Sequence, residues 1–342
     1  MALALARHGN GPAGGRGSQT ERQHPKTRLM YAYIVQRILA TIPVMAVVAL
    51  FVFALLHLTP GDPAAVIAGE LATVEDIARI RAQLGLDQPV HVQFLTWLAQ
   101  LAQGNLGTSI FSNLPVSHLI AQRLEPTAML SLTTIVFAIV VAVPMGVIAA
   151  WRAGTWIDRL VMGFAVLGFS IPVFVLGYLF IFVFAVELRW LPVQGYKPIG
   201  QGFWPFLQSI ALPSLTLGVI YVALIARITR ASMLEVLSED YIRTAQAKGL
   251  ATPAVLLGHA LKAAAVPIVT IIGVGIALLI GGAVITESVF AIPGLGRLTV
   301  DAILRRDYPI IQGVILVFSA AYVLVNLVID IIYPLLDPRI RY

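Results

Sequence analysis

Long runs of apolar residues, separated by shorter polar segments, dominate the pattern of this chain. An α-helix rises ~1.5 Å per residue, so a run of ~20 apolar residues can cross the ~30 Å hydrocarbon core of a bilayer. Such runs occupy residues 38–56, 126–151, 160–186, 213–226, 266–286 and 309–329. The pattern therefore predicts an all-α integral membrane protein with six transmembrane helices. Pro172 lies inside the third run and permits a kink there.

Composition agrees with this prediction. Hydrophobic residues make up 58% of the chain and charged residues 12%, whereas about a quarter of the residues of a soluble domain are charged. A formal net charge of +6 could indicate nucleic-acid binding, but the basic residues lie beside the apolar runs, so membrane topology explains them better. The chain has no cysteine, which excludes disulfides, thiolate chemistry and cysteine-ligated metals.

The distribution of basic residues predicts which side of the membrane each terminus faces. Residues 1–29 are glycine-rich and basic, and residues 335–342 carry Arg339 and Arg341. Because basic residues favour the cytoplasmic side, both termini are expected inside. The opening MALALA is too short for a signal-peptide core. We expect residues 1–29 to form a disordered cytoplasmic tail, with a lipid-binding arm as the alternative.

The longest polar segment, residues 59–125, has no positive excess and is predicted to lie outside as a helical loop. Thr73 and Asp76 have the spacing of a capping box that opens one amphipathic helix, and a second follows Pro89. These helices either cover the ends of the spans or form a docking surface for a substrate-delivering protein.

The predicted organisation is a tail (1–29), a first transmembrane helix (30–58), the outer loop (59–125), a five-helix core (126–334) with a cytoplasmic loop at 238–262, and a second tail (335–342).

The polar stretch 240–262, between the fourth and fifth runs, has an unusually regular pattern. Tyr241, Ala245 and Lys248 fall at helical spacing, and Gly249 follows them like a C-cap glycine. Thr252 and Pro253 then have the residue types of an N-cap and a first helical position. The pattern predicts a helix, a glycine turn and a second helix on the cytoplasmic side.

Motifs for site chemistry are missing from the sequence. It contains no GxxxxGK[ST] phosphate loop, no HExxH, no GxSxG and no metal-ligand spacing among its six histidines. The predicted span interiors hold essentially no ionisable residue, and His57, Glu287 and Asp330 at the span ends are interpreted as solvated caps. This pattern weighs against a secondary transporter, a channel or an intramembrane enzyme. A pathway driven by a partner protein is favoured, with a secondary transporter or channel as the alternative.

The form DYxRTAxAKGL at residues 240–250 resembles the cytoplasmic coupling loop of binding-protein-dependent ABC importer permeases, in the dipeptide/oligopeptide/nickel branch. Ala245, Gly249 and Leu261 match the general family motif, whereas other positions depart from it: Arg243, Thr244, His259 and Lys262. Further segments look like landmarks of the B-type subunit of this branch: PGDP (60–63), LGLDQP (84–89), GNLGTSI (104–110), RWLPVQGY (189–196) and SVFAIPGLG (288–296).

The resemblance implies a type I ABC importer permease fold in a bacterial inner membrane. It implies partners in the form of a second, related permease subunit, two ATPase subunits that bind ATP and Mg, an extracytoplasmic binding protein and membrane lipid, with no nucleic acid and no cofactor or metal in this chain. It assigns ATPase coupling to Asp240, Tyr241, Arg243, Thr244, Ala245, Lys248, Gly249, Leu250 and Leu261. It assigns binding-protein docking or an outer gate to Gly61, Asp62, Pro63, Glu287, Pro293, Gly294 and Gly296. Peptides, nickel chelates, glutathione-like compounds and other small solutes stay open as substrates.

Overall fold

The computed structural model describes residues 24–58, 62–68, 72–83 and 85–336, so the two ends of the chain, 1–23 and 337–342, lie outside the described residues. The first part of the chain forms α1 (His24–Leu58), α2 (Pro63–Ala68), α3 (Val74–Gln83) and α4 (Val90–Ala102). The remainder forms α5 (Val116–Trp151), α6 (Trp156–Ser170), α7 (Val173–Phe180), the π-helix η1 (Ile181–Glu187), the 3₁₀-helix η2 (Ile199–Gln201), α8 (Phe203–Leu237), α9 (Asp240–Ala247), the π-helix η3 (Ala254–Ala260), α10 (Leu261–Ala263), α11 (Ala265–Val289), α12 (Leu295–Arg305) and α13 (Tyr308–Leu336).

Five of the described helices are long and apolar enough to cross a membrane: α1, α5, α8, α11 and α13. The remaining predicted span, the third, at 160–186, is broken, because α6 and the helix formed by α7 and η1 meet at an angle of 104°. Ile171 and Pro172 cause the break: proline removes a backbone N–H and disfavours helical geometry in the residue before it, and both residues are extended, with ψ of 126° and 139°. The prediction of an all-α membrane protein with six spans is confirmed when this bent pair is counted as one span.

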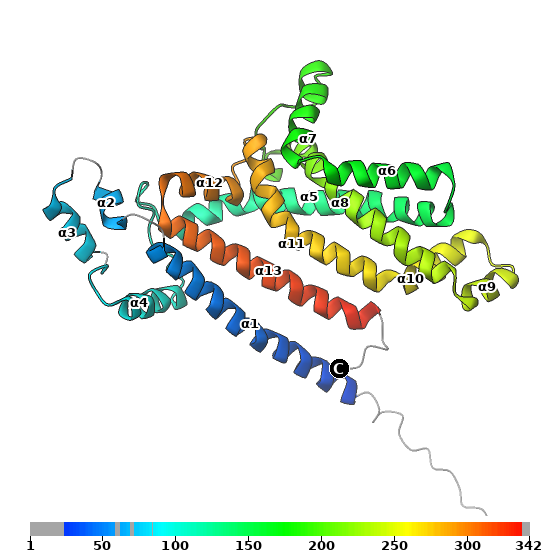
Figure 1. Ribbon diagram of the computed structural model, residues 1–342, viewed down its shortest axis with the longest axis horizontal. Coiled ribbons are helices and arrows are strands. Elements are labelled where there is room, and N and C mark those ends of the chain that lie inside the picture. The colour runs from blue at the N-terminus through cyan, green and yellow to red at the C-terminus, as the bar shows by residue number, and fades with distance from the viewer. Residues whose placement is uncertain (1–23, 59–61, 69–71, 84, 337–342) are drawn as a thin grey trace, which may run out of the picture.

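The centre of the molecule is the parallel pair α5 and α8, which pack along each other with α6 and α11 against them (Figure 1). Close approach depends on small residues. A Cβ on Gly146 of α5 would lie 2.7 Å from the carbonyl oxygen of Ala226, and a Cβ on Gly218 of α8 would lie 2.6 Å from the ring of Phe137. Small residues serve the same purpose at helix contacts within membranes generally.

The second and fourth predicted spans are much shorter than the helices that contain them. The fourth span is expected at 213–226, but α8 continues without a break to Leu237, so Arg227 and Arg230 belong to the membrane-spanning helix. Both arginines are good helix formers, and no glycine or proline follows until Gly249. The second span is expected from residue 126, but α5 begins at Val116 and includes Pro126 in its interior.

The predicted outer helices are present. Thr73 Oγ donates to Asp76 Oδ2 at 2.7 Å and accepts from the backbone N–H of Asp76 at 3.2 Å, so the capping box ahead of α3 is confirmed. This contact holds the pKa of the Asp76 carboxyl below its usual value. The helix expected after Pro89 is α4.

Two opposite ends of the molecule can be distinguished along its length. Helices α2, α3 and α4 lie at one end, which we call the loop end, and α9 lies at the other, which we call the finger end (Figure 1). Helix α1 begins, and helix α13 finishes, toward the finger end (Figure 1). These two helices lie side by side, and Arg37 of α1 forms an ion pair of 3.2 Å with Asp330 of α13. Asp330 is therefore paired rather than simply a solvated cap.

Candidate coupling and gating site

At the finger end, residues 240–263 form a compact projection that we call the finger (Figure 1). Its first arm, α9, ends in two backbone bonds that identify a Schellman motif: Gly249 N–H to Gln246 O at 2.9 Å and Leu250 N–H to Ala245 O at 3.3 Å. Gly249 has a φ of +79°, a left-handed conformation that favours glycine. The sequence prediction of a glycine turn after α9 is confirmed.

The second arm of the finger begins with a backbone bond from Val255 N–H to Ala251 O at 3.1 Å. Thr252 is already helical in this arrangement, so the expectation that it would be the N-cap is wrong; the helix starts one residue earlier. The arm continues as η3 and α10 and leads into α11. Leu261 is half-buried against a core cluster that includes Val255 and Leu256, so it supports the finger from within.

The residues that the sequence assigned to coupling gather on the exposed side of the finger. Tyr241 is 47% and Leu250 38% exposed, while Ile242 between them is fully buried and anchors α9 in the core. Arg243 pairs with Asp240 at 3.6 Å on the surface. Thr244, Lys248 and Gly249 are exposed as well, and Ala245 is half-buried. The result is a rigid surface with exposed apolar side chains and flanking charges, a composition suited to contact with another protein.

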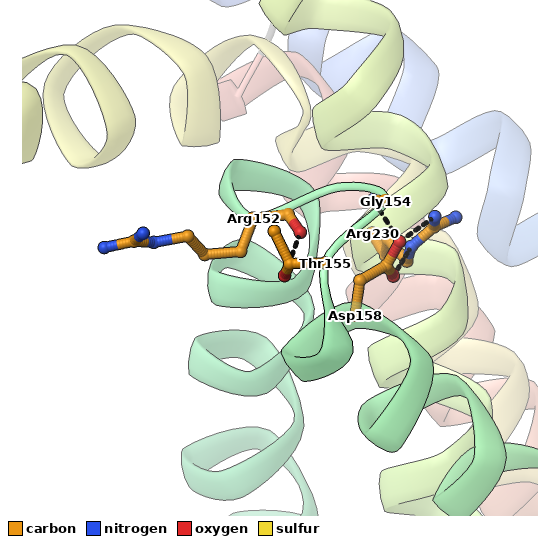
Figure 2. A network of polar contacts seen from close by, with 5 residues as sticks. All are labelled: Arg152, Gly154, Thr155, Asp158 and Arg230. Atoms are coloured by element: carbon orange, nitrogen blue, oxygen red, sulfur yellow. Dashed lines mark hydrogen bonds and ion pairs between the residues drawn. The ribbon is translucent and has the colours of Figure 1, made fainter.

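A buried ion pair, which we call the clamp, lies next to the finger and joins α6 to α8. Figure 2 shows the Asp158 carboxylate facing the Arg230 guanidinium, which donates from its Nη2 to Asp158 Oδ2 at 2.7 Å and from its Nε to Oδ1. Gly154 N–H, in the turn between α5 and α6, donates to the same carboxylate at 2.9 Å. The Arg152 side chain points away from the clamp in this view and lies 4.2 Å from the centre of the Trp151 ring, while its carbonyl accepts from Thr155 Oγ at 2.6 Å.

The clamp therefore fixes three elements at one point. The Asp158 side chain is 6% and the Arg230 side chain 25% exposed, so the pair is largely shielded from solvent and its two-pronged geometry is strong. The turn after α5, the start of α6 and the last third of α8 are tied together directly before the finger begins.

At the loop end, a second buried carboxylate organises the turn between α11 and α12. Glu287 accepts from Thr127 Oγ at 2.6 Å and from Arg297 N–H at 2.9 Å, and Thr127 Oγ in turn accepts from Leu295 N–H at 2.7 Å. We call these four residues the loop network. Glu287 is fully buried inside the end of α11, so its interpretation as a solvated cap is wrong. Nearby donors satisfy the carboxylate in place of water.

Two glycines leave the space that Glu287 occupies. A Cβ on Gly294 would lie 2.3 Å from the Glu287 carboxylate, and a Cβ on Gly296 would lie 2.6 Å from Val284 Cα. Both glycines are buried, whereas Pro293 beside them is exposed. Three of the residues assigned to docking or gating, Glu287, Gly294 and Gly296, thus come together inside the protein, and Pro293 marks the accessible tip of this turn.

The remaining docking candidates lie apart from the loop network. Asp62 accepts from Ala64 N–H at 3.1 Å and pairs with Arg81 of α3, and Pro63 begins α2. Gly61 lies outside the described residues. A separate contact joins the outer loop to the core, since Ser109 Oγ donates to the buried Asp307 carboxylate at 2.5 Å.

The loop that leads into α8 is also held by a polar contact. Tyr196 donates its hydroxyl to Glu125 Oε1 at 3.2 Å. Burial raises the pKa of Tyr196 to about 12, and the negative charge of Glu125 adds to this effect.

Within the described residues, no group of three acidic, histidine or cysteine side chains could hold a metal ion. The two ends therefore offer structural contacts and exposed surfaces suited to binding other proteins.

Comparison with known proteins decides the class of membrane protein to which this geometry belongs. Residues 142–342 match the family described as binding-protein-dependent transport system inner membrane component, and residues 30–133 match the N-terminal component of the same system. The chain belongs to this family. It is therefore a membrane-spanning permease component of the ABC importer class, and the resemblance seen in the sequence is confirmed.

Relatives of this permease match it along most of its length. The probable peptide ABC transporter permease protein y4tP of Sinorhizobium fredii is 55% identical over 313 residues, 92% of this chain and 100% of that protein. The glutathione transport system permease protein GsiC of Salmonella typhimurium is 46% identical with the same coverage, as is GsiC of Escherichia coli K12. In a solved structure, an inward-facing MetNI methionine ABC transporter, a chain matches with a TM-score of 0.54 at 19% identity, covering 65% of this chain and 97% of its own. The predicted importer permease fold is thus confirmed.

Sequence reasoning found the finger of this permease but missed the clamp and most of the loop network. Asp158 lies in a short polar turn, and a lone acid there beside two arginines, Arg152 and Arg159, is a signal for a charge partner. Thr127 gave no signal, because a threonine after Pro126 is unremarkable in a span. Its partners Glu287 and Leu295 lie 160 and 168 residues further along the chain.

Proposed function

We propose that this permease is the B-type subunit of an ATP-driven importer of short peptides, forming one half of the translocation pathway with a second, related permease. The finger is the observation that carries the proposal, because its exposed Tyr241 and Leu250 sit on a helix anchored by the buried Ile242. Such a surface suits a groove on an ATPase subunit. Full-length similarity to a peptide permease and to glutathione permeases supports the substrate class, since glutathione is itself a small peptide.

In this proposal, two ATPase subunits bind ATP and Mg, and this chain supplies no ATPase motif of its own. Closure of the ATPases moves the finger. The clamp then passes the movement to α6 and to the turn after α5, because Arg230 and the finger share one continuous stretch of chain. An extracytoplasmic binding protein delivers the peptide to the loop end, where Asp62 and Pro293 are the accessible candidates among the assigned residues.

The proposed orientation places the finger end in the cytoplasm of a bacterial inner membrane, with both termini on that side. The described ends of α1 and α13 lie toward the finger end (Figure 1), which agrees with this orientation. The basic residues Arg243, Lys248 and Lys262 on the finger favour the same side. Glu235, Glu239 and Asp240 lie close by, but acidic residues contribute little to membrane orientation.

The proposal is tested by reconstituting the complex, co-purified with its ATPase and second permease subunits, into lipid vesicles with the binding protein outside. We expect uptake of a labelled tripeptide that requires ATP and the binding protein and that survives an uncoupler of the proton gradient. Uptake that collapses with the uncoupler but survives ATP depletion would instead favour a secondary transporter. Movement of peptide by this chain alone would contradict the proposal directly.

A paired substitution tests the finger itself. The double variant Tyr241→Ser with Leu250→Ser removes the exposed apolar side chains and leaves Ile242 in place, so we expect the ATPase subunits to be lost during purification. Leu304→Ser is the matched control, because Leu304 is 78% exposed on α12, away from the finger. Equal retention of the ATPase subunits by both variants would count against the finger as their binding surface.

A further inference from the structure

Arg227 is a cation inside a membrane-spanning helix, and it faces an open hollow. It lies on α8, is exposed, and its guanidinium has no ion pair or hydrogen bond with any residue that the structure describes. The hollow, of about 150 Å³, lies between α6 and α8 and is lined by Arg227 together with Ala165, Phe169, Ser170 and Leu224 among others. Arg230, one helical turn further on, is by contrast fully engaged in the clamp.

The hollow extends well into the span from the clamp. Ser170, which lines it, ends α6, and Asp158 stands near the start of the same helix. At ~1.5 Å per residue these two positions are about 18 Å apart along the axis. Because helical side chains lean toward the N-terminus of their helix, Arg227 reaches away from the finger and toward the middle of α8.

An unpaired arginine on a membrane-spanning helix is unfavourable where it meets lipid tails, and charged residues within spans almost always face a water-filled path or a partner charge. The wall around Arg227 is otherwise apolar or small, with Phe169 64% exposed beside it. The planar guanidinium offers parallel donors that match a carboxylate. Ser170 adds a hydroxyl that now donates to Val166 O at 2.8 Å.

We propose that Arg227 binds the carboxylate of the transported solute within the translocation pathway, an assignment that rests on the proposed peptide importer. Peptides end in a carboxylate whatever their side chains, so a single arginine contacts this shared group without selecting among sequences. The hollow takes the adjoining backbone and small side chains against Phe169 and Leu224. Specificity for side chains is left to the binding protein, a separate chain.

The experiment compares uptake of labelled trialanine with uptake of its C-terminal amide by the reconstituted complex, in wild type, Arg227→Gln and Arg227→Lys. We expect Arg227→Gln to lower uptake of the free acid about 10- to 100-fold, the range for losing a charged hydrogen bond, and to change amide uptake less than twofold. Arg227→Lys keeps the charge without the two-pronged geometry and should fall between them. The same binding protein is used throughout, so its own preference cancels in the comparison.

A control variant and a change of lipid distinguish carboxylate binding from a structural role and from lipid binding. Arg305→Gln removes an exposed arginine from α12 and should leave both uptakes unchanged. Equal loss for acid and amide in Arg227→Gln would overturn the proposal and leave a structural role. A loss that appears only in vesicles containing phosphatidylglycerol, and equally for both peptides, would overturn it in favour of a lipid headgroup. If wild type takes up neither peptide, the importer proposal falls and this inference with it.

Discussion

The clamp and the loop network each bury a carboxylate, but they satisfy it in different ways. Asp158 faces a full positive charge on Arg230, so the clamp joins two side chains on two helices. Glu287 has no cation within ion-pairing distance among the described residues and is held by the Thr127 hydroxyl and a backbone N–H of the following turn. The clamp therefore depends mainly on two side chains, with the Gly154 N–H as a further donor, whereas the loop network depends on the backbone path of the turn at 293–297.

This difference matters for how each region responds to change. A side-chain ion pair survives small backbone movements because both side chains can follow, and it fails when either charge is removed. A carboxylate held by backbone N–H groups survives only while the turn keeps its conformation. The loop end is thus the region where backbone geometry and side-chain chemistry are linked most tightly.

The largest effect is expected from breaking the clamp. Asp158→Asn leaves the largely shielded Arg230 charge without a counter-charge, which should lower the free energy of unfolding by about 3 kcal/mol, the low end of the range for a buried pair, because the Arg230 side chain is 25% exposed. Thermal unfolding of the detergent-solubilised complex measures this loss. The double variant Asp158→Asn with Arg230→Gln removes both charges and should recover much of it. A double variant as unstable as the single one would show that the charge pair is not the source of the stability.

A smaller effect is expected from the same chemical change at the loop network. Glu287→Gln keeps the side-chain shape but turns an amide donor toward the Arg297 N–H or the Thr127 hydroxyl, leaving a buried group unsatisfied at a cost of about 1–3 kcal/mol. The same thermal unfolding assay should rank it below Asp158→Asn. A loss equal to or larger than that of Asp158→Asn would show that the loop network stabilises the protein at least as strongly as the clamp does.

One helix at each end of the molecule is followed by a residue in the left-handed conformation. The residue is Gly249 after α9 and Ala291 after α11. Gly249 follows α9 with a φ of +79°, and replacing it with alanine places a Cβ in a conformation that costs about 1 kcal/mol. A Cβ there meets no atom within 4 Å, so the loss is conformational rather than steric. Hydrogen exchange of the α9 amides should report faster local opening in Gly249→Ala. Unchanged exchange would show that the turn does not set the stability of the finger.

The corresponding position at the loop end is Ala291, with a φ of +53°, and Ile292 N–H bonds back to Glu287 O at 2.9 Å. Glycine adopts this conformation without the Cβ penalty. Ala291→Gly should therefore be neutral or raise the free energy of unfolding by about 0.5 kcal/mol, since the entropy of glycine offsets part of the gain. Thermal unfolding checks the sign. A clear destabilisation would mean that the Ala291 methyl makes an important contact.

The smallest expected effect is at the exposed capping box of α3. The pKa of Asp76 lies below its ordinary value of 3.8 because of its bonds to Thr73, so the cap is present above that value and is lost as the pH falls through the lowered pKa. Hydrogen exchange, corrected for intrinsic rates, should show α3 opening more readily below about pH 3.8, and Asp76→Asn should show less of this change. Identical pH dependence in both proteins would remove Asp76 as the cause.

Much of the fold could be predicted from local pattern alone. The apolar runs indicated the spans, and the Gly249 turn and the Thr73 capping box depend on residues close together in sequence. At Pro172 the sequence predicts only that a kink is permitted, because the angle of 104° is set by packing. The sequence places the end of the fourth span at residue 226 because hydropathy falls at Arg227, but helix propensity does not fall there and α8 continues to Leu237.

The polar contacts inside the protein could not be predicted in this way. Asp158 and Arg230 are 72 residues apart, and Glu287 and Thr127 are 160 apart, so no local signal joins them. Glu287 also sits beside a turn motif, where a charged residue ordinarily marks the end of a helix in water. Its burial follows from Gly294 and Gly296, whose missing side chains make room for it.

The pairing of α1 with α13 has a consequence for synthesis of the chain. Helix α1 packs chiefly against α13, with α4 touching it as well, and Gln312 of α13 donates to Val52 O at 3.3 Å. Because a ribosome makes the N-terminal end first, the first span enters the membrane long before its main neighbour exists. It must wait among lipids until the last span is inserted, so assembly of this chain is completed from its C-terminal end.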